Sequence, residues 1–126
     1  YLWDLDVRTF ITHSFNSDLG ITVRSPAGTV VTLTSANGGG SANVFNGTLW
    51  DDDANPGGQV PYATNNGLAT DHAYVLSTLA SPLAPEESLA AFFGENPNGI
   101  WTITISSPGT TPARNMRPTE TSAMKA

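Results

Sequence analysis

The sequence contains no cysteine among its 126 residues. Disulfides, thiol nucleophiles and thiolate metal sites are therefore excluded. Charged residues make up only 13% of the chain, whereas an average soluble domain has roughly 25%. No apolar run reaches the length of about 18 residues that a membrane-spanning helix needs. We predict one domain without a membrane span, in which most polar side chains are uncharged.

Basic residues are scarce in most of the chain. Residues 1–112 carry two arginines against ten acidic residues, whereas residues 113–126 carry three basic residues against one acidic residue. An acidic body argues against a nucleic-acid partner, because attraction to phosphates requires a basic face. It leaves divalent cations as candidate partners. Bound calcium would supply rigidity to a chain that has no disulfide.

Apolar and polar residues alternate in several short segments separated by turn residues. Residues 2–15 place leucine, valine and isoleucine on one parity, which is typical of a half-buried strand. Residues 19–24 and 29–35 repeat the pattern on either side of the turn Ser-Pro-Ala-Gly at 25–28, and residues 100–105 repeat it again. No segment shows sustained 3.6-residue periodicity. We therefore predict an all-β domain with the architecture of a jelly-roll β-sandwich.

Three other segments lack this alternation. Residues 51–74 form a long stretch rich in Asp, Asn, Gly and Pro, a length that is unusual unless the loop is functional or held in place. Residues 75–93 are consistent with one helical turn or with a short strand. Residues 107–126 contain three prolines and scattered charges. We predict a β-sandwich domain over residues 1–106, followed by a flexible or partner-binding tail over residues 107–126.

Three consecutive aspartates, Asp51, Asp52 and Asp53, form the aspartate triplet. The triplet superficially matches the start of an EF-hand loop, but that loop requires Gly at its sixth position and Glu at its twelfth. Pro56 and Tyr62 occupy those positions, so an EF-hand is excluded. Calcium also accepts irregular sets of oxygen ligands, and two aspartates of a turn can converge on one ion. A solvated acidic turn explains the same residues equally well.

A calcium site at the aspartate triplet would need a further ligand from elsewhere in the chain. Asp18 is one candidate, and Asp4 together with Asp6 is the other. Spacing alone does not choose between them.

The sequence offers no convincing catalytic group. His13 and Ser14 are adjacent, so on a strand their side chains point to opposite faces and cannot act as partners. His13 shares its parity with apolar residues, which favours a packed structural histidine. A carboxylate pair for glycoside hydrolysis is a further alternative, but the candidates Glu86, Glu87 and Glu95 all lie in turn-like contexts.

The three tryptophans could instead form a platform on which sugars stack. Trp101 belongs to the core by its alternation, whereas Trp3 and Trp50 fit either the core or an exposed platform.

Three segments carry recognisable motifs in a fixed order. They are ITHSFNSDLGITVRSPAGTVVTL at 11–33, GGSANVFNGTLWDDDA at 39–54 and LAPEESLAAFFGENPNGIWTITI at 83–105. This order resembles the P domain, also called the P/homo B domain, of subtilisin-like proprotein convertases and of bacterial secreted subtilisin-like proteases. In that family a Thr-His strand, an Asp-Leu turn, a Ser-Pro turn, a Phe-Asp-Asp-Glu-Ala motif and an Asn-Gly-x-Trp motif follow one another.

The resemblance implies a jelly-roll sandwich without catalytic machinery, in an extracellular and bacterial protein. Such a domain would stabilise a subtilisin-like serine protease or assist its substrate recognition. Its partner would be the protease domain of the parent chain or a protein substrate. The resemblance also implies a Ca²⁺ cofactor, with ligands at Asp18, Asp51, Asp52 and Asp53. A carbohydrate-binding or surface-adhesion module is the alternative function, and an enzyme with a carboxylate site ranks below it.

The chain departs from the family pattern at both ends. The strand that normally precedes residue 4 is mostly absent, and the tail lacks the family's last strand with its Asn-Ser-Trp motif. Missing strands leave backbone groups unpaired at a sheet edge. We therefore expect strand swapping, a homo-oligomer, or closure of the sheet by the tail.

Overall fold

The computed structural model describes residues 1–37, 40–54, 74, 76–106 and 124–125. Residues 55–73 of the predicted loop and most of the predicted tail therefore lie outside the described residues. The described elements are β1 (Val7–Phe10), η1 (Asn16–Asp18), β2 (Gly20–Arg24), β3 (Val30–Ser35), β4 (Asn46–Trp50), η3 (Leu89–Phe92), β5 (Thr102–Ser106) and β6 (Met124–Lys125), where η marks a 3-10 helix.

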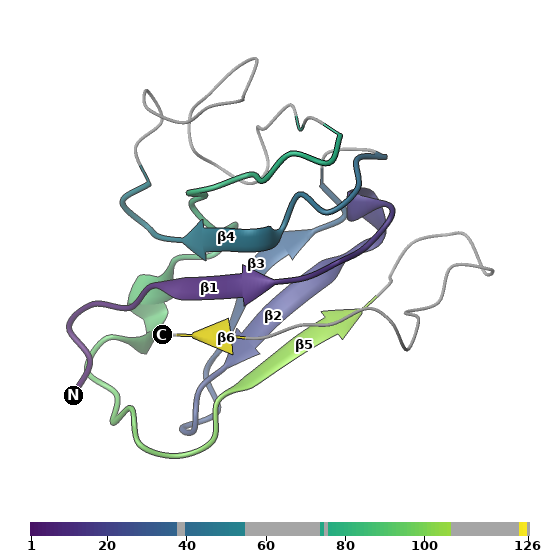
Figure 1. Cartoon of the computed structure of the whole chain (residues 1–126). Coiled ribbons are helices and arrows are strands. Elements are labelled where there is room, and N and C mark those ends of the chain that lie inside the picture. The colour runs from purple at the N-terminus through teal and green to yellow at the C-terminus, as the bar shows by residue number, and fades with distance from the viewer. Residues whose placement is uncertain (38–39, 55–73, 75, 107–123, 126) are drawn as a thin grey trace.

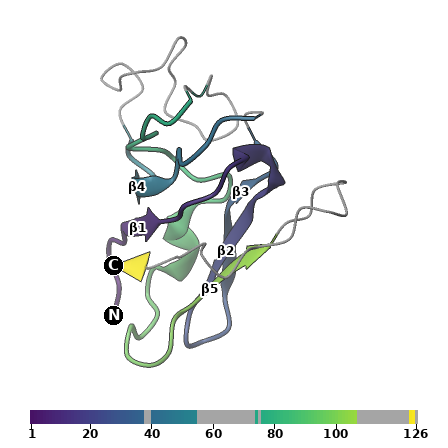
Figure 2. The same ribbon diagram turned by 45° about the vertical axis from the view of Figure 1, so that its right-hand side comes forward.

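The strands form two three-stranded antiparallel sheets with the orders β4-β1-β6 and β3-β2-β5. The two views in Figures 1 and 2 show the two sheets as separate layers, with the strands of one crossing those of the other at an angle. No α-helix occurs among the described residues. The prediction of an all-β domain is confirmed. No helix of the described chain has the length and apolarity to cross a membrane.

The core contains the alternating apolar residues of both sheets. Its largest fully buried side chains are Trp50, Phe45, Phe92, Ile11, Leu19, Ile21, Leu33, Leu83, Leu89, Val7, Val23 and Val31. As predicted, Trp101, Ile103 and Ile105 pack against this cluster, although each remains half-buried.

Trp50 lies at the centre of this core with 0% of its surface exposed. Its indole Nε1 donates a hydrogen bond of 2.9 Å to Thr9 Oγ1, and its ring lies 5.4 Å from that of Phe45. A buried indole N–H requires a partner, which Thr9 supplies from the neighbouring strand. The hypothesis that Trp50 forms an exposed sugar platform is therefore wrong.

The outer edges of β3 and β4 are covered by irregular backbone. The amides of Glu86 and Glu87 donate to the carbonyls of Leu33 and Thr32, and the Glu87 carboxylate accepts from the Thr32 amide at 2.7 Å. These hydrogen bonds from Thr32 hold the pKa of Glu87 below its ordinary value. Residues 80–83 cover β4 in the same way. Covering an edge in this way removes unpaired backbone groups from solvent.

Two predicted elements are shorter than expected. The strand predicted over residues 2–15 is regular only at Val7–Phe10, and its register with β4 shifts between Thr9 and Phe10. Within residues 75–93, the described part forms the single helical turn η3 and no strand longer than an isolated bridge. At the other end of the chain, β6 pairs with β1, opposite Arg8 and Thr9.

Candidate functional site

Three segments that are distant in sequence meet at one edge of the molecule. Val7 pairs with Trp50, so the residues before β1 and those after β4 lie side by side. The amide of Leu2 donates to the carbonyl of Glu95 at 2.9 Å, and the amide of Gly94 donates to the carbonyl of Leu2 at 2.8 Å. Residues 1–6, the aspartate triplet and the region around η3 therefore share this edge.

Asp52 fixes the triplet to η3. Its Oδ1 accepts the Leu89 amide at 2.9 Å, and its Oδ2 accepts the Ala90 amide at 3.0 Å and the Ser88 hydroxyl at 2.6 Å. The first amides of a helix have no intrahelical acceptor, and an aspartate oxygen satisfies them as a capping residue does. Both oxygens of Asp52 are thus engaged in structural hydrogen bonds. Sequence spacing did not reveal this contact, because the cap comes from a distant segment.

Asp51 holds the turn that contains the triplet. Its Oδ1 accepts the amide of Asp53 at 2.7 Å, which is the hydrogen bond of an Asx turn. Its own amide donates to the carbonyl of Leu83 at 2.9 Å, and the amide of Ala54 donates to its carbonyl at 3.1 Å. Asp53 itself is exposed. The triplet is therefore an ordered turn in which the three carboxylates occupy different environments.

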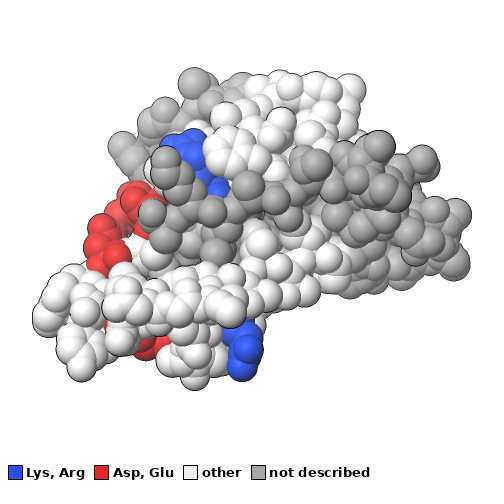
Figure 3. All heavy atoms as spheres, turned by 60° about the horizontal axis from the view of Figure 1, so that its bottom comes forward, with Lys and Arg blue, Asp and Glu red and all other residues white. Residues whose placement is uncertain are grey.

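The pKa of Asp6 is raised by its surroundings at this edge. Partial burial raises its pKa above the ordinary value, and the charges of Asp51, Asp4, Asp53 and Asp52 raise it further, in that order. We call these five residues the acidic edge. The sequence left Asp4 and Asp6 open as the alternative to Asp18, and the structure brings them to the triplet. Figure 3 shows acidic side chains gathered on one side of a face whose remaining described surface is mostly uncharged.

Asp18 lies elsewhere. It belongs to η1, beyond the C-terminal end of β1, whereas the triplet adjoins the N-terminal end of that strand. The carboxyl group of Asp18 is buried beside Asn16, whose side-chain oxygen accepts the Ser41 amide at 2.8 Å. Asp18 and the triplet therefore do not form one group. Within the described residues, no set of three or more His, Asp or Glu side chains is arranged to hold a metal ion.

The other candidate residues have structural roles. His13 is buried, and its Nδ1 accepts the Phe15 amide at 3.1 Å, which fits a packed structural histidine. Ser25 is also buried, and its hydroxyl donates to Glu95 Oε1 at 2.7 Å. Glu86 accepts hydrogen bonds from the amide and hydroxyl of Ser35. These contacts fasten loops to the sheets.

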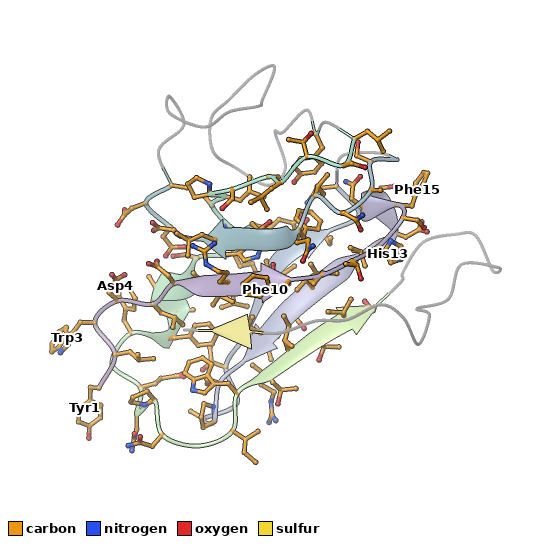
Figure 4. The ribbon with its side chains drawn as sticks, in the orientation of Figure 1. Tyr1, Trp3, Asp4, Phe10, His13 and Phe15 are labelled. Carbon is orange, nitrogen blue, oxygen red and sulfur yellow. The ribbon has the colours of Figure 1, made fainter. Side chains whose placement is uncertain are left out.

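The aromatic residues at the start of the chain are exposed. Tyr1 and Trp3 each have 85% of their surface accessible, and Phe93 has 42%. Figure 4 shows the side chains of Tyr1 and Trp3 directed away from the body of the molecule. The sequence left Trp3 undecided and did not single out Tyr1 or Phe93.

Comparison with protein families gives a match over residues 2–116 to the family model described as Proprotein convertase P-domain. A comparison with curated proteins and one with solved structures found no match. P domains are non-catalytic accessory β-sandwich domains of subtilisin-like proteases, which are typically secretory-pathway proteins. Because the match covers most of the chain, this protein belongs to the proprotein convertase P-domain family.

Proposed function

We propose that this chain stabilises a secreted subtilisin-like serine protease or assists its substrate recognition. The family match over residues 2–116 carries this proposal, because the family consists of accessory domains associated with a subtilisin-like catalytic domain. The partner is then the protease domain of the parent chain or a protein substrate. We also infer an extracellular protein of bacterial origin and a complete jelly-roll connectivity, as the resemblance implies.

The hydrogen bonds of the site support an accessory role. Asp52 joins the triplet to η3, Glu86 and Glu87 cover β3, and Ser25 joins its turn to Glu95. Each contact links segments that are far apart in sequence without the help of a disulfide. The carboxylates of Asp52, Glu86 and Glu87 therefore hold loops in position. This arrangement suits a rigid body that supports a partner.

The experiment is to produce the parent protein with and without residues 1–126. Yield of active enzyme is measured with a peptide substrate, and the chain alone is assayed in parallel. The proposal predicts a lower active yield without the domain and no hydrolysis by the chain alone. Equal yields, or a parent protein without a subtilisin-like domain, would contradict it.

We further propose that Ca²⁺ binds at the acidic edge. The pKa of Asp6 is raised first by burial and then by the charges of the neighbouring aspartates. Those charges support the proposal, because a divalent cation would neutralise them. The described carboxylates are not already arranged around a metal ion, so binding would have to draw Asp6, Asp51 and Asp53 together around it. Asp52 is the least available, since both of its oxygens cap η3.

Calcium at about 100 times its Kd would add roughly 2.7 kcal/mol to the free energy of unfolding. The test compares thermal unfolding in EDTA and in millimolar calcium for the wild type, Asp6→Asn and Asp18→Asn. The proposal predicts a calcium-dependent rise in Tm that Asp6→Asn reduces and Asp18→Asn retains. Identical curves in EDTA and calcium, or loss of the shift in Asp18→Asn alone, would refute it.

Carbohydrate binding is the second candidate, and the exposure of Trp3 favours it. An exposed indole offers a flat apolar face of the kind on which a sugar ring packs. This version no longer involves Trp50, which is buried. Binding of a glycan array by the wild type and not by Trp3→Ala would establish it, and an array without signal would exclude it for the glycans tested.

A further inference from the structure

The turn Asn-Pro-Asn-Gly at residues 96–99 ends in an Asn-Gly pair, Asn98 and Gly99. Both residues are exposed, and the turn is followed by Ile100, Trp101 and then β5. Asparagine is a thermolabile residue. When glycine follows it, the backbone nitrogen of the glycine can attack the side-chain amide, because glycine has no Cβ to obstruct the approach. The turn therefore exposes a reactive pair to water.

Packing explains why residue 99 is glycine. Gly99 has a φ of +129°, and a Cβ at this position would lie 2.8 Å from the Cβ of Pro26. The turn at 25–28 therefore approaches the turn at 96–99 so closely that only glycine fits without displacement. Asn98 is consequently followed by the residue that leaves its side chain most open to attack.

The backbone amide of Gly99 is available for this attack. It donates no hydrogen bond within the described part of the chain, whereas the backbone amide of Asn98 donates to Asn96 Oδ1 at 3.0 Å. An exposed amide without an acceptor loses its proton more readily than one that is held in a hydrogen bond. The nucleophile and the group that it attacks are thus both accessible in the folded chain.

Asn46 and Gly47 form a second Asn-Gly pair in a different environment. They belong to β4, in which Asn46 pairs with Phe10. The amide of Gly47 donates to the carbonyl of Phe45 at 3.2 Å, and the carbonyl of Gly47 accepts from Arg8 Nη1 at 2.7 Å. Attack by this amide requires β4 to open locally, and opening costs more in a paired strand than in an exposed turn.

We propose that Asn98 is a site of spontaneous deamidation in the folded chain, whereas the pairing of β4 protects Asn46. The backbone nitrogen of Gly99 loses its proton and bonds to Cγ of Asn98, and the side-chain nitrogen leaves with that proton as ammonia. The resulting succinimide ring is opened by one water molecule at either carbonyl, which gives aspartate or isoaspartate. Water is the sole co-reactant, and no electrons are transferred. This inference is independent of the proposed accessory role.

The product differs from the original turn in two ways. Residue 98 gains a negative charge, and the isoaspartate form has one additional backbone carbon before Gly99. The turn is held on both sides of this bond, since Trp101 Nε1 donates to the carbonyl of Pro97 at 2.8 Å and Gly99 lies against Pro26. A longer backbone displaces at least one of these contacts. We therefore expect the isoaspartate form to have a lower Tm than the unmodified chain.

The test incubates the whole folded chain in warm, mildly alkaline buffer and digests samples with chymotrypsin. Cleavage after the flanking aromatic residues isolates residues 94–101 and residues 46–50. Mass spectrometry follows the replacement of the amide group by a hydroxyl group in each peptide. Asn96 is an internal control, because it precedes Pro97, whose nitrogen carries no hydrogen. The chain unfolded in guanidinium chloride gives the reference rate of each pair.

In the folded chain we expect Asn98 to deamidate at least about tenfold faster than Asn46, because an opening free energy of about 1.4 kcal/mol slows the paired site by that factor. In guanidinium chloride the two rates should become similar. Asn98→Gln should abolish the modification of residues 94–101 and leave that of residues 46–50 unchanged. Equal rates at Asn46 and Asn98 in the folded chain, or modification of Asn96 in place of Asn98, would overturn the site.

The consequence for the turn has its own control. Asn98→Asp adds the negative charge without the additional backbone carbon, so its Tm should be close to that of the wild type. The isoaspartate form is separated by chromatography, and its Tm is compared with both. An isoaspartate form as stable as Asn98→Asp would refute the displacement of the turn.

Discussion

Asp52 and Ser88 are joined by a hydrogen bond of 2.6 Å from the serine hydroxyl to Asp52 Oδ2, although 36 residues separate them in sequence. The same carboxylate accepts the amides of Leu89 and Ala90. Asp52 is therefore the cap of a helical turn that belongs to another segment. This contact fixes the aspartate triplet to η3.

Removing this cap should destabilise the domain. Asp52→Ala removes the acceptor of the Leu89 amide and one of the two acceptors of the Ala90 amide, which also donates to Ser88 Oγ. We expect the free energy of unfolding to fall by about 1 kcal/mol. Asp53→Ala is the matched control, because its exposed side chain should change stability by no more than about 0.5 kcal/mol. Urea unfolding in EDTA measures both. Equal stability of the two variants would show that the cap contributes nothing.

Trp50 is buried and Trp3 is exposed, so their replacement by alanine should affect stability very differently. Trp50→Ala leaves a cavity at the centre of the core and removes the hydrogen bond to Thr9. We therefore expect the free energy of unfolding to fall by about 3–5 kcal/mol. Trp3→Ala removes an exposed side chain and should leave the free energy of unfolding within about 0.5 kcal/mol of the wild type. Comparable losses in chemical denaturation would mean that Trp3 is part of the folded core.

The pH dependence of stability should change when Asp6 is replaced. Burial, followed by the charges of the neighbouring aspartates, raises the folded-state pKa of Asp6 above its unfolded-state value. The folded chain therefore holds this proton more tightly, and stability is lost as pH rises through the folded-state pKa. Asp6→Asn should raise the free energy of unfolding at pH 7 by up to about 0.5 kcal/mol.

The advantage of Asp6→Asn should disappear at about pH 3, below the unfolded-state pKa of an aspartate. Urea unfolding of both proteins across this pH range is the measurement. An advantage that persists unchanged at low pH would show that repulsion at the acidic edge is not its cause.

Gly99 should tolerate alanine less well than Gly94. A Cβ at Gly99 would lie 2.8 Å from the Cβ of Pro26, and its φ of +129° is disfavoured for other residues. At Gly94 the φ is +84°, but no atom lies within 4 Å of such a Cβ. The positive φ destabilises both variants, and the free energy of unfolding should fall by about 1 kcal/mol more in Gly99→Ala than in Gly94→Ala. Equal Tm values in calorimetry would contradict the close approach.

The alternation of apolar residues predicted the β-class, and the segments 19–24, 29–35 and 100–105 correspond closely to β2, β3 and β5. Period-2 patterns succeed there because each strand buries one face against a single core. The pattern over 2–15 overestimated β1, which is limited to Val7–Phe10. Alternation alone also could not detect the register shift between Thr9 and Phe10. Motif order predicted the family, which the comparison confirmed.

The candidate site was less predictable because it depends on nonlocal contacts. The aspartate triplet was visible in the sequence, but its cap on η3 and its proximity to Asp6 were not. Asp18 was grouped with the triplet by the resemblance, yet β1 separates them. Trp3 and Trp50 have the same chemistry, and only the packing of the two sheets makes one exposed and the other buried.

The accessory role is tested most directly by the half-life of the parent protease at an elevated temperature, with and without residues 1–126. Irreversible thermal inactivation follows the unfolding rate, so it reports stabilisation by a neighbouring domain. The account predicts a shorter half-life for the protease that lacks the domain. Equal half-lives for the intact and shortened proteases would contradict it.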